Sequence, residues 1–215
     1  MVWQGLFGRR ELPGVIYISA TLLLLFGCVA LHELGHALMA RRLDVVVKNI
    51  IILPVGGLAQ VQALPDRPLF DLLIAAAGPL VNLLLALAAA LALSALGRVN
   101  FLLGFLASPD TVTEAILQKP FHHDALIGII IFLLVANGLL FVFNLIPAFP
   151  MDGGRILRAL LVLFLPYHRA TWVAVVVGQL FAIVLLLLAY PLRSFGLLLV
   201  GILLLGTGWF IKLGR

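Results

Sequence analysis

Long runs of apolar residues dominate the chain, and short segments between them carry most of its charges. A run of about 20 apolar residues is long enough to cross the hydrocarbon core of a bilayer as an α-helix. Five runs approach or exceed that length and predict five spans, at residues 15–40, 70–96, 125–146, 170–189 and 195–211. A further apolar stretch, 155–165, is too short to span, so we expect a re-entrant or interfacial helix there.

The segment between the first two spans has a different pattern and is rich in β-branched residues. Residues 45–53 and 58–62 lie on either side of Pro54 and the pair Gly56-Gly57. Two β-rich runs around a Pro/Gly cluster are typical of a β-hairpin.

These patterns predict an all-α polytopic membrane protein with about five transmembrane helices and a short re-entrant or interfacial helix. A small cytoplasmic β-hairpin, residues 45–62, is inserted after the first span. We expect a single domain over residues 1–215, with a short N-terminal segment at 1–14 and a long outer loop at 98–124.

Composition and charge support a membrane protein. The chain is 64% apolar and 11% charged, whereas soluble domains are about half apolar and a quarter charged. A net charge of +5 would suggest nucleic acid as the partner of a soluble protein. Here the fourteen Lys and Arg residues lie mostly between apolar runs, so we expect a lipid bilayer and no nucleic acid as partner.

The distribution of these basic residues also predicts an orientation. Nine of the fourteen fall on the side where the first span ends, and five on the other. Cytoplasmic loops carry the excess of Lys and Arg. We therefore expect a multi-pass protein of the cell membrane, with the hairpin and the C-terminus in the cytoplasm.

The first span contains the pattern HExxH, formed by His32, Glu33 and His36. Residues four apart share one face of a helix, so both imidazoles can bind one zinc ion. Glu33 lies beside them to accept a proton from water. A carboxylate inside a span costs on the order of 3 kcal/mol to insert and usually faces a functional cavity. The alternative is that local hydrogen bonds satisfy all three side chains.

Two histidines leave a catalytic zinc site one protein ligand short. The candidates are Asp152, the remaining histidines and the carboxylates at span ends or in loops, where a charge costs little. Those carboxylates are Asp66, Asp71, Asp110, Glu114 and Asp124.

Asp152 differs from the other candidates because it follows an interrupted helix. Pro147 and Pro150 break the helix before it, and Gly153 and Gly154 after it allow tight backbone turns. Irregular backbone at membrane depth is tolerated only where it is buried or lines a wet cavity. Asp152 can also be read as the cap of the helix that follows. The incomplete zinc site favours the ligand interpretation.

With these motifs in view, the chain resembles the site-2 protease family of intramembrane metalloproteases. HELGH at 32–36 lies in a span, and the later segment 144–154 has the pattern NxxPxxPxDGG. The glycine pair at 56–57 and the segment AGPLVN at 77–82 are also similar. The resemblance covers residues 20–160.

This resemblance implies roles for five residues. His32, His36 and Asp152 would bind one zinc ion per chain, and Glu33 would be the catalytic acid/base. Asn144, eight residues before Asp152, would lie near the active site, where its amide can donate to a developing oxyanion. For Asn144 the alternative is a hydrogen bond between helices.

The sequence thus predicts a zinc-dependent endopeptidase that hydrolyses transmembrane protein substrates within or at the edge of the bilayer, as in regulated intramembrane proteolysis. Its active site would lie towards the cytoplasmic side. The hairpin would either pair with an unwound substrate as an added strand or pack against the helices.

Two other functional classes stay open. One is a metal-binding membrane protein without proteolysis, which would not need Glu33. The other is a transporter, for which broken helices in pairs are typical. The sequence has only one such broken segment.

Overall fold

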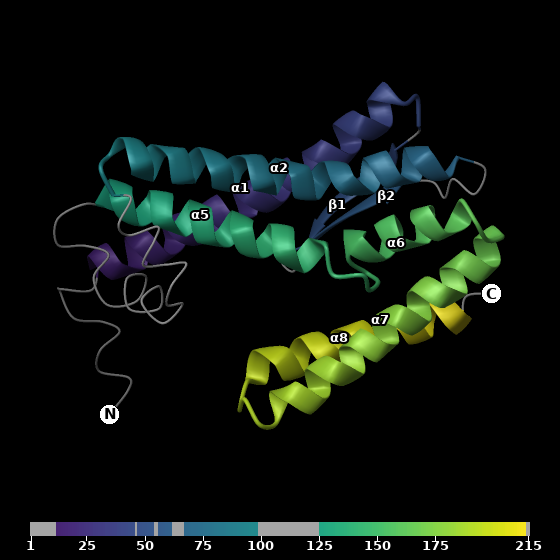
Figure 1. The fold of residues 1–215 in the computed structure, drawn as a ribbon. Coiled ribbons are helices and arrows are strands. Elements are labelled where there is room, and N and C mark those ends of the chain that lie inside the picture. Colours follow the sequence, from purple (N-terminus) through teal and green to yellow (C-terminus); the bar gives the residue numbers. More distant parts are fainter. Residues whose placement is uncertain (1–11, 46, 54–55, 62–66, 99–124, 214–215) are drawn as a thin grey trace. The chain divides into compact units, whose positions relative to one another are not determined.

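The computed structural model describes residues 12–45, 47–53, 56–61, 67–98 and 125–213, and most of them are helical. Figure 1 shows the helices, which vary widely in length. They are α1 (Leu12–Arg42), α2 (Pro68–Ala95), α5 (Ala125–Asn144), α6 (Asp152–Val162), α7 (Tyr167–Ala189) and α8 (Phe195–Leu213).

Four helices are long and apolar enough to cross a membrane: residues 19–42, 68–95, 126–144 and 167–189. Less than half of the most apolar window of each is buried inside the protein. Apolar side chains that face outward in such numbers are suited to lipid and not to water. A multi-pass membrane protein is therefore confirmed, with four candidate spans. The fifth predicted span falls on α8, whose described apolar part, Phe195–Gly206, is shorter, and it stays a prediction.

Two strands, β1 (Val47–Leu53) and β2 (Gly56–Val61), follow α1. They pair antiparallel, with a register irregularity between Val47 and Ile50. They lie where the sequence predicts a hairpin, and its cytoplasmic position stays a prediction. The connecting residues 54–55, and nearly all of the predicted segments 1–14 and 98–124, fall outside the described residues.

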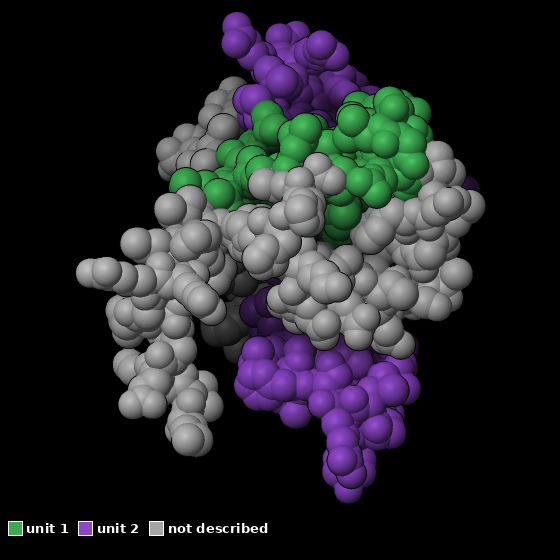
Figure 2. Space-filling model, turned by 90° about the vertical axis from the view of Figure 1, so that its left-hand side faces the viewer, with its two compact units in different colours: residues 1–31, 82–139 green, residues 32–81, 140–215 purple. Residues whose placement is uncertain are grey.

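The chain divides into two compact units, coloured separately in Figure 2. The first comprises residues 1–31 and 82–139, and the second residues 32–81 and 140–215. In the first, Asn137 Nδ2 contacts Cys28 Sγ at 3.2 Å, and both side chains are buried. The single-domain organisation stays a prediction. The candidate site described below lies in the second unit.

The helix break predicted by the two prolines is present. Helix α5 ends at Asn144 and α6 begins at Asp152, three residues earlier than the predicted stretch 155–165. With 11 residues, α6 is about 16 Å long, too short to span. Ala148 in the connection is fully buried with Ala182 and Leu204. A Cβ on Gly178 would lie 2.9 Å from Ala148 Cα, so α7 packs directly on this connection.

Asp71 corrects the expectation that the carboxylates at span ends carry little cost. It is 5% exposed, in the first turn of α2. It accepts hydrogen bonds from Arg155 Nη2 at 3.1 Å and from Arg158 Nη2 at 2.7 Å. The two arginines are three residues apart and therefore share one face of α6. The ion pairs tie α6 to the start of α2, which a single-residue reading of charge does not reveal.

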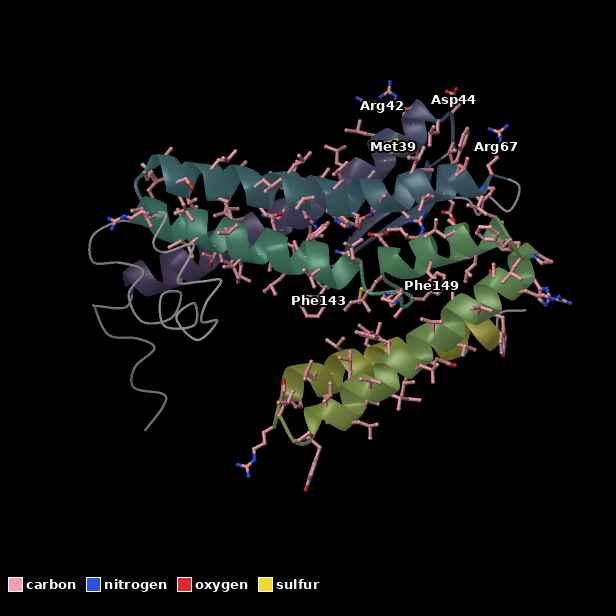
Figure 3. The ribbon with its side chains drawn as sticks, in the orientation of Figure 1. Met39, Arg42, Asp44, Arg67, Phe143 and Phe149 are labelled. Carbon is pink, nitrogen blue, oxygen red and sulfur yellow. The ribbon has the colours of Figure 1, made fainter. Side chains whose placement is uncertain are left out.

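We expect the substitution Asp71→Asn to lower the free energy of unfolding by about 3 kcal/mol, because two largely buried guanidinium groups lose their counter-charge. Thermal unfolding of the purified protein in detergent measures the effect. Asp44→Asn is the matched control. Asp44 is exposed just beyond the end of α1, and its side chain points outward, away from the helices (Figure 3). Its φ of +53° is one that Asn also tolerates. Equal melting temperatures for the two variants would contradict the buried role of Asp71.

Candidate metal centre

Helix α1 carries His32, Glu33 and His36, which are 5%, 5% and 2% exposed. They are buried because α1 packs closely on α2 at a glycine. A Cβ on Gly35 would lie 2.9 Å from the Ala77 carbonyl oxygen. The absence of a side chain at Gly35 thus lets this face of α1 reach the backbone of α2.

The hydrogen bond between His36 Nδ1 and the Ile74 carbonyl oxygen, 2.7 Å long, orients the imidazole. A carbonyl oxygen can only accept, so Nδ1 carries the hydrogen and donates it. In the neutral imidazole, Nε2 then has a free lone pair. Metal-binding histidines are typically held in this way by a backbone carbonyl.

Two further potential ligand atoms lie beside this nitrogen and complete a group of three. His32 Nε2, His36 Nε2 and Asp152 Oδ2 lie 3.1 Å from one another in each pairing. Ligands of a tetrahedral zinc ion at 2.0–2.1 Å are roughly 3.3 Å apart. Two imidazole nitrogens and one carboxylate oxygen are also a typical donor set of a catalytic zinc site with one open position. The three residues therefore fit a metal ion.

Asp152 is the first residue of α6 and does not cap that helix through its side chain. Burial by itself raises the pKa of Asp152, but hydrogen bonds and charge attraction from His32 and His36 in their protonated forms outweigh it and lower the pKa to about 2. The carboxyl group is therefore ionised at neutral pH, the form that binds a metal. Asp152 is therefore placed where a ligand could bind a metal ion, and its role as a ligand stays a prediction.

The two glycines after Asp152 serve close packing and not a turn. Gly153 and Gly154 are helical and are not among the described glycines with positive φ, contrary to the predicted tight turns. A Cβ on Gly153 would collide with the Leu145 and Ile146 carbonyl oxygens. A Cβ on Gly154 would lie 2.8 Å from the carbonyl carbon of Ala148. Both glycines hold the first turn of α6, and with it Asp152, against the preceding connection.

Gly78 is a packing residue whose contact with the two imidazoles the sequence did not predict. A Cβ there would collide with Nε2 and Cε1 of His36 and would lie 2.8 Å from Cε1 of His32. The backbone of α2 therefore runs directly beside the two imidazoles. The available signal was its place in the segment AGPLVN, but that motif does not say which side chain the glycine faces.

The remaining candidate carboxylates and Asn144 are not part of the described group of three, or they fall outside the described part of the chain. Asn144 Nδ2 donates to the Leu140 carbonyl oxygen of its own helix at 2.9 Å, and no described contact joins it to the donors. Asp71 pairs with the arginines of α6 instead. Four candidate carboxylates fall outside the described residues: Asp66, Asp110, Glu114 and Asp124.

Comparison with known proteins gives one family. Residues 20–187 match the model of peptidase family M50. A zinc metalloprotease of Methanocaldococcus jannaschii is 34% identical over 211 residues, 97% of this chain and 52% of the relative. A putative zinc metalloprotease of Synechocystis sp. is 33% identical over 195 residues, 90% of this chain and 44% of the relative. The chain thus spans about half the length of these relatives.

Among solved structures, a site-2 protease from Methanocaldococcus jannaschii is similar in fold, with a TM-score of 0.59 and 29% sequence identity. The match covers 90% of this chain and 83% of that chain. Similarity over this length extends beyond the HELGH helix and includes the segment that carries Asp152.

We expect Gly78→Ala to weaken zinc binding by about 100-fold or more, at or beyond the upper end of the effect of losing an outer-shell partner. The added methyl group would displace the imidazole of His36. Zinc content after dialysis and competition with a chelator measure the effect. Gly27→Ala is the control, because a Cβ on Gly27 meets nothing within 4 Å. Full zinc content in Gly78→Ala would show that the imidazoles do not depend on this close approach.

Proposed function

The chain belongs to peptidase family M50, the site-2 protease family, and from this premise we propose that it is a zinc-dependent endopeptidase acting on membrane-spanning proteins. Cleavage would occur within or at the edge of the bilayer. The observation that carries the proposal is the convergence of His32, His36 and Asp152 in a buried group next to Glu33. All four side chains lie in or beside helices that are apolar enough to be in lipid.

In this proposal His32, His36 and Asp152 hold one zinc ion. When bound, zinc acts as a Lewis acid that lowers the pKa of water towards roughly 7 and polarises the scissile carbonyl. The hydrogen bond from His36 Nδ1 to Ile74 keeps Nε2 available as a ligand.

Glu33 is the proposed general base and acid. It accepts a proton from the attacking water and later donates a proton to the departing amine. The same carboxyl group can do both, because the proton that it takes from water is the one that the departing nitrogen needs. Among the described residues, the structure gives the Glu33 side chain no hydrogen bond or ion pair, so its carboxylate is not committed to a structural partner.

Asn144 is the proposed hydrogen-bond donor to the substrate. An amide nitrogen carries two hydrogens, so the bond to Leu140 leaves one for a substrate carbonyl that develops negative charge.

The proposed substrate is a single-span membrane protein, and the proposed location of the protease is the cell membrane. Its site would open towards the cytoplasmic side, where the basic residues are more numerous. A transmembrane substrate hides its peptide bonds in helical hydrogen bonds, so it must unwind before attack. β1 and β2 would lie on the same cytoplasmic side and could pair with the unwound segment.

The test compares the wild type with Glu33→Gln and Asp152→Ala in zinc content and in cleavage. We expect about one zinc per chain in the wild type and in Glu33→Gln. We also expect loss of zinc in Asp152→Ala, since two histidines alone make an incomplete site. Cleavage should fall at least about 100-fold in Glu33→Gln, which loses acid/base catalysis.

Because the substrate is unidentified, cleavage is followed in the membrane proteome of cells that express each variant. New N-termini inside membrane spans are mapped by mass spectrometry. They should accompany the wild type and be absent with Glu33→Gln. Equal cleavage by Glu33→Gln would refute the mechanism, and a wild type without zinc would favour a protein of another class, such as a transporter.

A further inference from the structure

The carboxylate of Asp152 is contacted from two sides. Its Oδ2 faces the nitrogens of His32 and His36 at 3.1 Å. Its Oδ1 lies 3.7 Å from Arg155 Nη1, and the other terminal nitrogen of this arginine, Nη2, donates to Asp71 Oδ1 at 3.1 Å. One guanidinium group therefore bridges the candidate metal ligand and a buried carboxylate of α2.

Arg158 makes a different set of contacts, although it is three residues away on the same face of α6. It donates to Asp71 Oδ2 at 2.7 Å, and its guanidinium lies over the rings of Phe149 and Tyr167, at 5.6 and 5.1 Å. Figure 3 shows Phe149 on the connection beside α6. No described ion pair joins Arg158 to Asp152. Arg158 thus shares with Arg155 the partner Asp71, but it has no described contact with the candidate metal ligand Asp152.

We propose that Arg155 is a positioning residue for the zinc ligand Asp152, and that Asp71 holds Arg155 in place. With Arg155 against Oδ1, the carboxylate presents Oδ2 alone to the two imidazoles. A carboxylate that binds through one oxygen leaves room for the open position that a catalytic site needs. This inference rests on the proposed zinc site.

The charge of Asp71 explains how a cation can lie so close to a metal site. An arginine beside Asp152 would by itself repel a divalent cation and weaken its binding. Asp71 offsets part of that charge, because its single negative charge is shared through hydrogen bonds with the two arginines. Asp71, Asp152, Arg155 and Arg158 together carry no net charge. Arg155 then orients the Asp152 carboxylate through the two terminal nitrogens of its rigid planar guanidinium group.

The position of Arg155 beside Asp152 follows from the geometry of α6. Asp152 and Arg155 are three residues apart in the first turn of the helix, so they lie on one face. The collisions that a Cβ on Gly153 would make show how closely that turn lies against the Leu145 and Ile146 carbonyl groups. The guanidinium is thereby fixed at one end by the helix and at the other by Asp71.

The experiment measures the zinc affinity of the purified chain by competition with a chelator at pH 7, together with the melting temperature of the zinc-free protein. We expect Arg155→Gln to weaken zinc binding about 10- to 100-fold, the range typical of losing an outer-shell partner. The matched control is Arg158→Gln, which also removes an ion pair to Asp71. It should lower the melting temperature but keep the zinc affinity within about threefold of the wild type, since an outer-shell residue affects the metal through its contact with a ligand.

A second variant separates charge from geometry. Arg155→Lys keeps the positive charge, but a single ammonium group cannot bridge two carboxylates as a planar fork does. We expect its zinc affinity to stay below that of the wild type. Full recovery by Lys would overturn the positioning role.

Other outcomes also decide the matter. Unchanged or tighter zinc binding in Arg155→Gln, or an equal loss in Arg158→Gln, would overturn the inference. The proposed function would still stand if the wild type binds zinc and Asp152→Ala does not. If the wild type binds no zinc, the proposed function fails first and this inference fails with it.

Discussion

The structure around the candidate site depends on a buried group of three potential ligand atoms. These atoms lie 3.1 Å from one another. Nε2 of His36 bears a lone pair when Nδ1 donates to Ile74, and it points at an ionised carboxylate. Such a group repels itself unless a proton or a cation lies between its members. A metal ion would satisfy all three atoms at once. It would thereby connect the two histidines of α1 to Asp152 at the start of α6.

Glycines make this convergence possible. At Gly35 the backbone of α1 comes close to the Ala77 carbonyl group of α2, and at Gly78 the backbone of α2 comes close to the imidazoles of α1. At Gly153 the first turn of α6 rests on carbonyl groups. Lipid does not drive helices together as water does, so close van der Waals packing has to supply the attraction. Small residues at these contacts therefore both stabilise the helix pairs and leave space for the imidazoles.

Beside the metal group, two carboxylates and two arginines of the described second unit form one cluster in which their charges balance. α6 contributes three of the four charged groups, Asp152, Arg155 and Arg158, from one face, and Asp71 of α2 completes the set. A short helix that cannot span the membrane is thus held by ion pairs and by the connection that precedes it. In this arrangement Arg155 contacts both the candidate metal ligand Asp152 and Asp71, which anchors α6.

The sequence by itself determined the membrane class, the approximate positions of four spans, the helix break before Asp152 and the pairing of His32 with His36. Each depends on apolar run length, proline or helical period, which are local properties. It also pointed to Asp152, but only through a motif and an incomplete site. Tertiary structure alone decided that Asp71 joins the arginines of α6, 84 residues away in the case of Arg155, and that Gly78 faces the imidazoles. No local pattern encodes such contacts, because they arise only when distant helices pack.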